Sequence, residues 1–137
     1  TVNVDAIGIG YYLARHLQDH GYAVRDVNVG EASSDPEKYK NLKAELYWGL
    51  RQRFHDGGVC GLTDEKTVDQ LASIRYEHNA RGQIEIESKD HAAARGVRSP
   101  DRAESLMLAF IQPPVRTVLA THLRAESRPR TDWSEAP

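Results

Sequence analysis

The stretch at residues 2–17, VNVDAIGIGYYLARHL, decides the fold class. Apolar residues alternate with polar ones over residues 2–6, which indicates a strand with one buried face. From Ile9 onward apolar side chains recur at helical spacing, until Gly21 stops the helix near Asp19. Residues 22–29, YAVRDVNV, are again strand-like. The first thirty residues therefore predict a parallel, right-handed β-α-β unit.

The middle of the chain predicts two helices and a hairpin. Asp35 as N-cap and Pro36 at the first helical position predict a helix that runs to about His55. TDEKTVDQLASI, residues 63–74, predicts another helix, with Thr63 as its cap. Two alternating runs around a turn at residues 79–82 predict a β-hairpin. Strands and helices alternate, as in an α/β fold.

Two more segments are predicted before the end of the chain. KDHAAARG, residues 89–96, indicates a short helix or turn that ends at Gly96. Ser99 as N-cap and Pro100 at the first helical position begin the last helix, which proline ends at 113–114. Its predicted buried stripe is Ala103, Leu106, Met107 and Phe110. We expect one domain over residues 1–112 and a loosely ordered tail over 113–137.

The composition limits the function classes. The 137 residues suit one core, and no apolar run is long enough to span a bilayer, so no membrane is expected as a partner. Cys60 is the only cysteine, which excludes an internal disulfide and suits a reducing cytoplasm. The net charge of −2 gives no support to a domain that holds DNA by charge alone, yet it permits a nuclease with metal-binding carboxylates.

The glycine turn does not fit a nucleotide site. Gly8 and Gly10 begin a dinucleotide fingerprint, but Leu13 stands where the third glycine belongs, and there is no phosphate-binding G-K-[ST]. A tight strand-to-helix turn explains the two glycines. Asp5 stands at the carboxyl end of the predicted strand, where α/β sheets place function, and must be solvated, paired or a metal ligand.

A second acidic group begins the last predicted helix. Asp101 and Glu104 lie away from its apolar stripe, where their oxygens suit a hard cation such as Mg²⁺. The helix dipole alone would also favour Asp101 there. The basic residues nearby suit either phosphate binding or a solvated charged surface, and they are Lys89, Arg95, Arg98 and Arg102.

In this order, residues 2–111 resemble the nuclease domain of phage terminase large subunits, which belong to the DNA-packaging motor. Four blocks carry the resemblance: VDAIGIG at 4–10, YKNLKAELYWGLRQRF at 39–54, IEIESKD at 84–90 and SPDRAESLMLAF at 99–110. The resemblance implies an RNase H-like mixed sheet flanked by helices. It also implies that this chain lacks the fold's N-terminal strands, with the first catalytic aspartate, and the motor's ATPase domain.

The resemblance assigns roles to four residues. Asp5 and Asp101 match the family's metal-binding aspartates, and Glu104 stands where the family often has aspartate, as an auxiliary ligand. Lys89 matches the family lysine, with a positioning or charge-balancing role. Two Mg²⁺ or Mn²⁺ ions held there would support phosphodiester hydrolysis. Arg95, Arg98 and Arg102 would contact DNA.

The implied function is an endonuclease that cuts concatemeric double-stranded viral DNA in the cytoplasm of a bacterial host, from a phage or prophage. The implied partners are the terminase small subunit and the portal protein. Two alternatives stay open: another RNase H-like nuclease, such as a resolvase or transposase core, and a non-catalytic docking domain. Without the upstream strands, the strand at residues 2–7 would have an unpaired edge, so we expect strand-mediated self-association.

Overall fold

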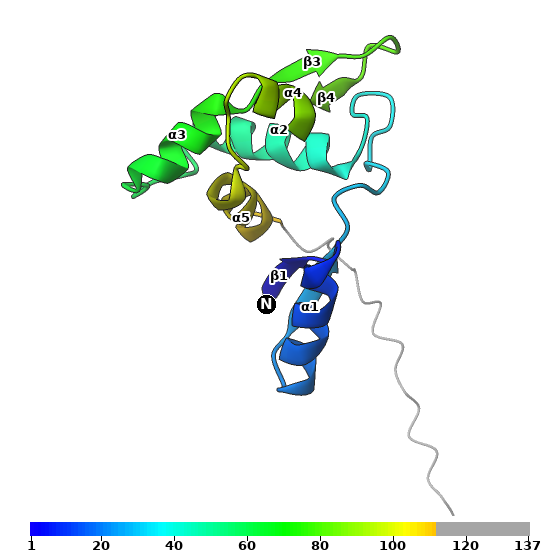
Figure 1. Cartoon of the computed structure of the whole chain (residues 1–137), viewed down its shortest axis with the longest axis vertical. Helices are drawn as coiled ribbons and strands as arrows, with labels where there is room; N and C mark the ends of the chain where they lie inside the picture. The colour runs from blue at the N-terminus through cyan, green and yellow to red at the C-terminus, as the bar shows by residue number, and fades with distance from the viewer. Residues whose placement is uncertain (112–137) are drawn as a thin grey trace, which may run out of the picture.

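The computed structural model describes residues 1–111 and begins with the predicted β-α-β unit (Figure 1). Strand β1 (Val2–Asp5), helix α1 (Ile9–Asp19) and strand β2 (Val24–Val27) follow one another. The strands are parallel, with Asp5 opposite Val27. This unit occupies the lower part of Figure 1, and the remaining elements lie above it. The prediction for these three elements is confirmed.

The two glycines after β1 serve the backbone. Gly8 has a φ of 64°, which is a conformation that favours glycine. A Cβ at Gly10 would lie 1.7 Å from the carbonyl oxygen of Asp5, a separation that no side chain tolerates. The carboxylate of Asp5 accepts the N–H of Ile7 at 3.1 Å and fixes the turn. Helix and strand are therefore pressed together at the point where Asp5 stands.

Helix α2 (Leu42–His55) begins later than predicted. Its N-cap is Asn41, whose side chain accepts the N–H of Ala44 at 3.0 Å, and Asp35 closes only a turn. The intervening residues pair with the hairpin instead, since Tyr39 forms an isolated parallel bridge with Ile84. The prediction of a helix start at Asp35 and Pro36 was wrong because this long-range pairing outweighs the local capping signal.

The remaining elements follow in the predicted order. Helix α3 (Glu65–Ser73) precedes the antiparallel hairpin of β3 (Tyr76–His78) and β4 (Ile84–Ile86), and then come α4 (Lys89–Ala94) and α5 (Asp101–Ala109). The cap of α3 is Asp64, not Thr63 as predicted, because the Asp64 side chain accepts the N–H of Thr67 at 2.9 Å. Among residues 1–111 the strands form two pairs, β1–β2 and β3–β4.

The core is small and centred on α2. Tyr47 and Leu50 of α2 and Met107 of α5 form the buried cluster, which partly buried apolar residues surround. Of the predicted stripe of α5, Ala103 and Met107 are buried, whereas Leu106 and Phe110 are partly buried against the cluster. The predicted tail, 113–137, lies outside the described residues. No helix within residues 1–111 is long and apolar enough to cross a membrane.

Candidate metal centre

Strand β1 and helix α5 lie side by side, although they are almost the whole described chain apart. The side-chain amide of Asn3 donates to the carbonyl oxygen of Leu108 at 2.8 Å, which ties the strand to the end of the helix. Asn3 and Asp5 share a face of β1 because side chains alternate along a strand. Asp5 therefore stands on the face of β1 that is turned to α5.

One cavity brings the predicted acids together. Its volume is about 150 Å³, and residues from β1, the segment after β2, α2 and α5 border it. They are Asp5, Val29, Lys43, Asp101, Glu104, Ser105, Met107 and Leu108. Three acidic residues from both ends of the described chain, Asp5, Asp101 and Glu104, thus border one cavity.

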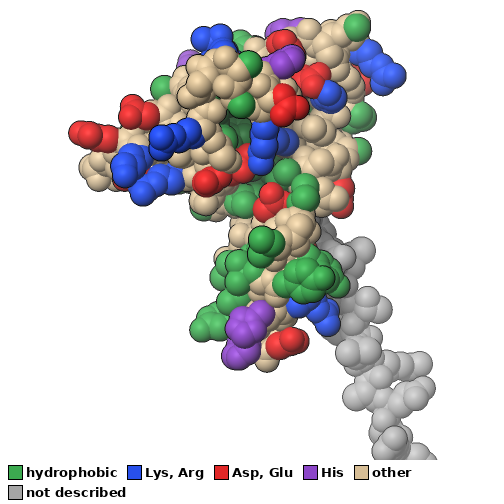
Figure 2. Space-filling model, in the orientation of Figure 1, with side chains coloured by type: hydrophobic (Ala, Val, Ile, Leu, Met, Phe, Trp, Pro, Cys, Tyr) green, Lys and Arg blue, Asp and Glu red, His purple; other side chains and the backbone are tan. Residues whose placement is uncertain are grey.

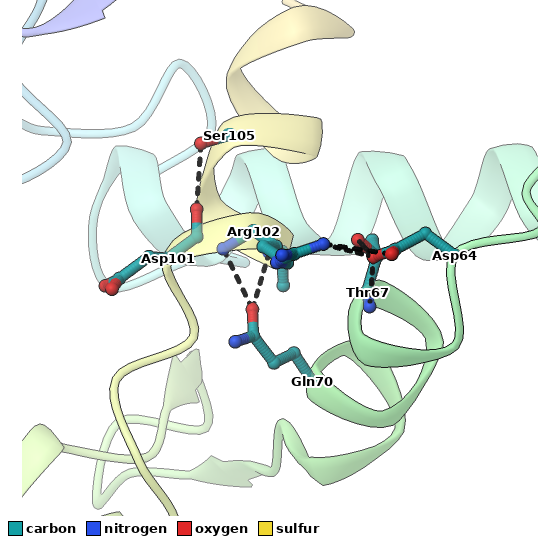
Figure 3. Close-up of polar contacts among 7 residues, drawn as sticks. Asp64, Thr67, Gln70, Asp101, Arg102 and Ser105 are labelled. Carbon is teal, nitrogen blue, oxygen red and sulfur yellow. Dashed lines mark hydrogen bonds and ion pairs between the residues drawn. The ribbon is translucent and has the colours of Figure 1, made fainter.

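The two side chains at the start of α5 point in opposite directions (Figure 3). Arg102 reaches Asp64 at the start of α3, with its Nη1 at 2.8 and 2.9 Å from the two carboxylate oxygens. Asp101 points away from this pair and accepts the hydroxyl of Ser99 at 2.5 Å. The charge of Asp101 is therefore not neutralised by its neighbour Arg102.

A side chain from α3 caps α5. The Oε1 of Gln70 accepts the backbone N–H of Arg102 at 2.8 Å and that of Ala103 at 3.1 Å (Figure 3). Ser99 was predicted as the N-cap, but its hydroxyl donates to the Asp101 carboxylate, and α5 begins after Pro100. The position of Asp101 therefore depends on packing between α3 and α5.

Glu104 is paired with Lys43, a residue that the sequence analysis did not single out. The Lys43 Nζ donates to the Glu104 carboxylate at 2.7 Å, and each side chain is 21% exposed. The two residues are 61 positions apart, and no local pattern at Lys43 indicates a contact with α5. Burial, with a smaller effect of the Glu104 charge, raises the pKa of the nearby Tyr47 phenol, which stays protonated.

The predicted basic residues fall into two groups. Arg95 pairs with Glu87 through Nε at 2.8 Å, and hydrogen bonding within this pair lowers the pKa of Glu87 and raises that of Arg95. Arg102 is held by Asp64. We call the cavity bordered by Asp5, Asp101 and Glu104 the acidic cavity. Lys89 and Arg98 do not border it but line a neighbouring cavity of about 270 Å³, which we call the basic hollow. Within residues 1–111, neither of these two side chains forms an ion pair.

The acidic residues that border the cavity carry oxygen donors. Carboxylate oxygens are the ligands that Mg²⁺ prefers, and it is commonly held by one or two carboxylates together with waters and substrate phosphates. Asp5 and Asp101 supply two carboxylates without an ion-pair partner among the described residues, whereas Glu104 is paired with Lys43. Within residues 1–111, no group of three or more acidic, histidine or cysteine side chains is placed to hold a metal ion by itself.

The fold is similar to solved nuclease domains from the large terminase subunit gp2 of bacterial virus Sf6. The nuclease domain matches with a TM-score of 0.67 and 20% identity, over 82% of this chain and 65% of that chain. A lysine-to-alanine variant with manganese matches with a TM-score of 0.66 and 19% identity, over 81% of this chain and 65% of that chain. The same variant with calcium matches with a TM-score of 0.67 and 20% identity, over 81% of this chain and 64% of that chain.

At this identity the likeness establishes the fold. The chain has the mixed α/β, RNase H-like fold of terminase nuclease domains, and the resemblance predicted from its four sequence blocks is confirmed. The chain spans about 65% of the length of these neighbours. No protein-family model matches the sequence, and no curated protein is similar to it at a significant level.

Proposed function

We propose that this chain is part of a divalent-metal-dependent DNA endonuclease of the terminase type, which cuts concatemeric double-stranded viral DNA during packaging. The observation that carries the proposal is the convergence of Asp5 and Asp101 on one cavity, in a fold shared with terminase nuclease domains. The terminase small subunit and the portal protein are the proposed partners. The cytoplasm of the bacterial host is the proposed location.

Asp5 and Asp101 are the residues that would hold Mg²⁺ or Mn²⁺. A divalent ion bound there supplies Lewis-acid stabilisation of a phosphate oxygen and lowers the pKa of a bound water. Asp5 is held by the turn at Ile7, and Asp101 by the hydroxyl of Ser99. Both carboxylates are thus oriented before a ligand arrives, which lowers the cost of binding.

Lys43 determines what Glu104 contributes. Because Lys43 neutralises Glu104, this carboxylate acts as an auxiliary group. Its ion pair with Lys43 connects α2 to α5 beside the cavity. The predicted arrangement of two ions would need a further free carboxylate, which the described residues do not place in the cavity. We therefore expect weak metal binding and weak cleavage by this chain alone.

Lys89 and Arg98 are the proposed contacts to the DNA backbone. They border the hollow beside the acidic cavity and have no ion-pair partner among residues 1–111, so their charges are available to phosphates. Arg95 and Arg102 are engaged with Glu87 and Asp64, which makes them structural residues first. Among RNase H-like nucleases, a resolvase or a transposase core remains an alternative for the same site.

A calorimetric titration with Mn²⁺ tests the metal site. Binding should be lost in Asp5→Asn and in Asp101→Asn, and retained in Asp69→Asn, which removes an exposed acid from α3. In a plasmid-nicking assay with Mn²⁺, the slow cleavage by the chain should disappear in the first two variants. Unchanged binding in these variants, or strong cleavage that they retain, would refute the proposal.

The second candidate is a non-catalytic docking domain, which the incomplete ligand set favours. The same titration separates the two functions. A docking domain should show no Mn²⁺ binding that depends on Asp5 or Asp101, whereas the nuclease requires it.

A further inference from the structure

An aromatic groove lies on the hairpin side of α2, outside the acidic cavity. It has a volume of about 300 Å³, enough for one nucleotide-sized ligand. Apolar residues of α2, α3 and β4 form its floor. The residues that matter here are Trp48 and Arg51 from α2 and Arg75 and Tyr76 at the start of the hairpin. We call the cavity that these four residues border the aromatic groove.

The groove combines aromatic rings with two arginine side chains. The rings of Trp48 and Tyr76 meet edge to face at 5.1 Å, and Tyr76 is 46% exposed. The Arg51 guanidinium lies 4.7 Å from the centre of the Trp48 ring. Neither Arg51 nor Arg75 forms an ion pair with any described residue. Two guanidinium groups therefore flank an aromatic surface, and of these Arg75 also lies near enough to Glu87 to lower the pKa of that carboxylate. Cations beside aromatic rings suit a base with its phosphate.

The groove, the basic hollow beside Lys89 and Arg98, and the acidic cavity are neighbours that share lining residues. Arg75 borders both the groove and the hollow, and Lys43 borders both the hollow and the cavity. Two carboxylates also border the hollow: Glu87, which is paired with Arg95, and Asp90. Arg75, Lys89 and Arg98 outnumber the remaining charge of Asp90, so the lining of the hollow carries a net positive charge.

The buried phenol of Tyr47, between the groove and the hollow, has no hydrogen-bond partner among the described residues. Tyr47 borders both the groove and the hollow, and it is only 6% exposed. A buried donor without a partner is costly, so a ligand or a water in the hollow would stabilise it.

We propose that the aromatic groove binds single-stranded DNA. One base stacks on the exposed ring of Tyr76 beside Trp48, Arg51 and Arg75 bind the adjacent phosphates, and the backbone runs over Lys89 and Arg98 toward the cavity of Asp5 and Asp101. A single strand is favoured over a duplex because the faces of bases in a duplex are covered by stacking on neighbouring base pairs, whereas an unpaired base can turn a face to an aromatic ring. The choice of DNA rests on the proposed function, and the binding surface does not.

Fluorescence anisotropy with a labelled oligothymidine, in EDTA and at low salt, tests the groove without any metal. Tyr76→Ala should weaken binding about fivefold or more, the range expected for the loss of one stacked base. Tyr12→Ala on α1 is the matched control, because Tyr12 is 75% exposed and remote from the groove. Arg51→Gln should also weaken binding, and Arg15→Gln on α1 should not.

Fluorescence of Trp48 gives a second, local measurement. The sequence has two tryptophans, so Trp133→Phe leaves Trp48 as the only one. Oligothymidine should quench this emission as the base stacks, whereas heparin, which has charge but no bases, should not. Tyr76→Leu keeps an apolar side chain in place and should still weaken binding, which separates stacking from loss of fold.

Three results would overturn the inference: a Tyr76→Ala variant that binds no worse than Tyr12→Ala, a duplex that binds as tightly as the single strand, or equal quenching by heparin. The proposals for the metal site and for the groove can be refuted independently of each other. Oligothymidine binding in EDTA that persists in Asp5→Asn supports the groove even if Mn²⁺ titration refutes the nuclease.

Discussion

At the scale of single residues, the position of Asp5 depends on the absence of a side chain at Gly10. The backbone of α1 passes so close to the end of β1 that a Cβ at Gly10 would overlap the carbonyl oxygen of Asp5. The same carbonyl belongs to the residue whose carboxylate borders the acidic cavity. A change at Gly10 therefore acts on the candidate site through the backbone.

Gly10→Ala should lower the free energy of unfolding by about 1–3 kcal/mol, the usual cost of forcing extra atoms into packed structure. Urea unfolding followed by circular dichroism measures it. Gly49→Ala is the matched control: a Cβ there meets nothing within 4 Å, inside helix α2, so a gain of about 0.5–1 kcal/mol is expected. Equal stability of the two variants would contradict the close approach at Gly10.

At the scale of elements, α3 and α5 are joined by one carboxylate with two tasks. Asp64 caps α3 through Thr67 and also binds Arg102 of α5 (Figure 3). Hydrogen bonds from the Thr67 side chain, and then from Arg102, lower the pKa of Asp64 to about 2. The unfolded chain has the ordinary value of 3.8. Folding therefore gains from ionised Asp64 above pH 4, and this gain is lost as the pH falls toward 2.

Asp64→Asn should reduce the melting temperature at pH 6, and the difference from the unsubstituted protein should shrink between pH 4 and pH 2. Thermal unfolding across this pH range measures it. Asp69→Asn, which changes an exposed acid of the same helix, should leave the acid dependence unchanged. A difference that stays constant down to pH 2 would contradict the role of Asp64.

The same scale shows what the sequence could predict. The β-α-β unit and the hairpin were predictable because periodicity and turn residues are local signals, and β1 and α1 begin where these signals place them. The start of α2 was not, because Tyr39 is drawn to Ile84 across the fold. The cap of α5 by Gln70 and the pairing of Lys43 with Glu104 join distant segments, so no spacing in the sequence reveals them.

At the scale of the whole molecule, the β-α-β unit carries much of the exposed apolar surface. Figure 2 shows hydrophobic side chains gathered over this lower part of the molecule. The large exposed apolar residues of this unit are Val2, Ile7, Ile9, Tyr11, Tyr12, Leu13 and Tyr22. Among the described residues, β1 pairs only with β2, so its other edge is not paired with a strand. Such an edge beside apolar surface favours pairing with another chain.

We expect this chain to self-associate as its concentration rises, which light scattering after size exclusion would measure. Val2→Lys places a charge on the open strand and should shift the population toward monomer. Val68→Lys is the matched control, because Val68 on α3 is exposed to nearly the same extent, 43% against 42%. A monomer at all concentrations, or an equal effect of the two lysines, would contradict the expectation.

The acidic cavity is bordered by two parts of the molecule, with Asp5 on the β-α-β unit and Asp101 on α5. A ligand bound by both carboxylates would link these two parts and add its binding free energy to the stability of their contact. Ligand binding and the packing of the two parts against each other are thus thermodynamically linked, so each stabilises the other.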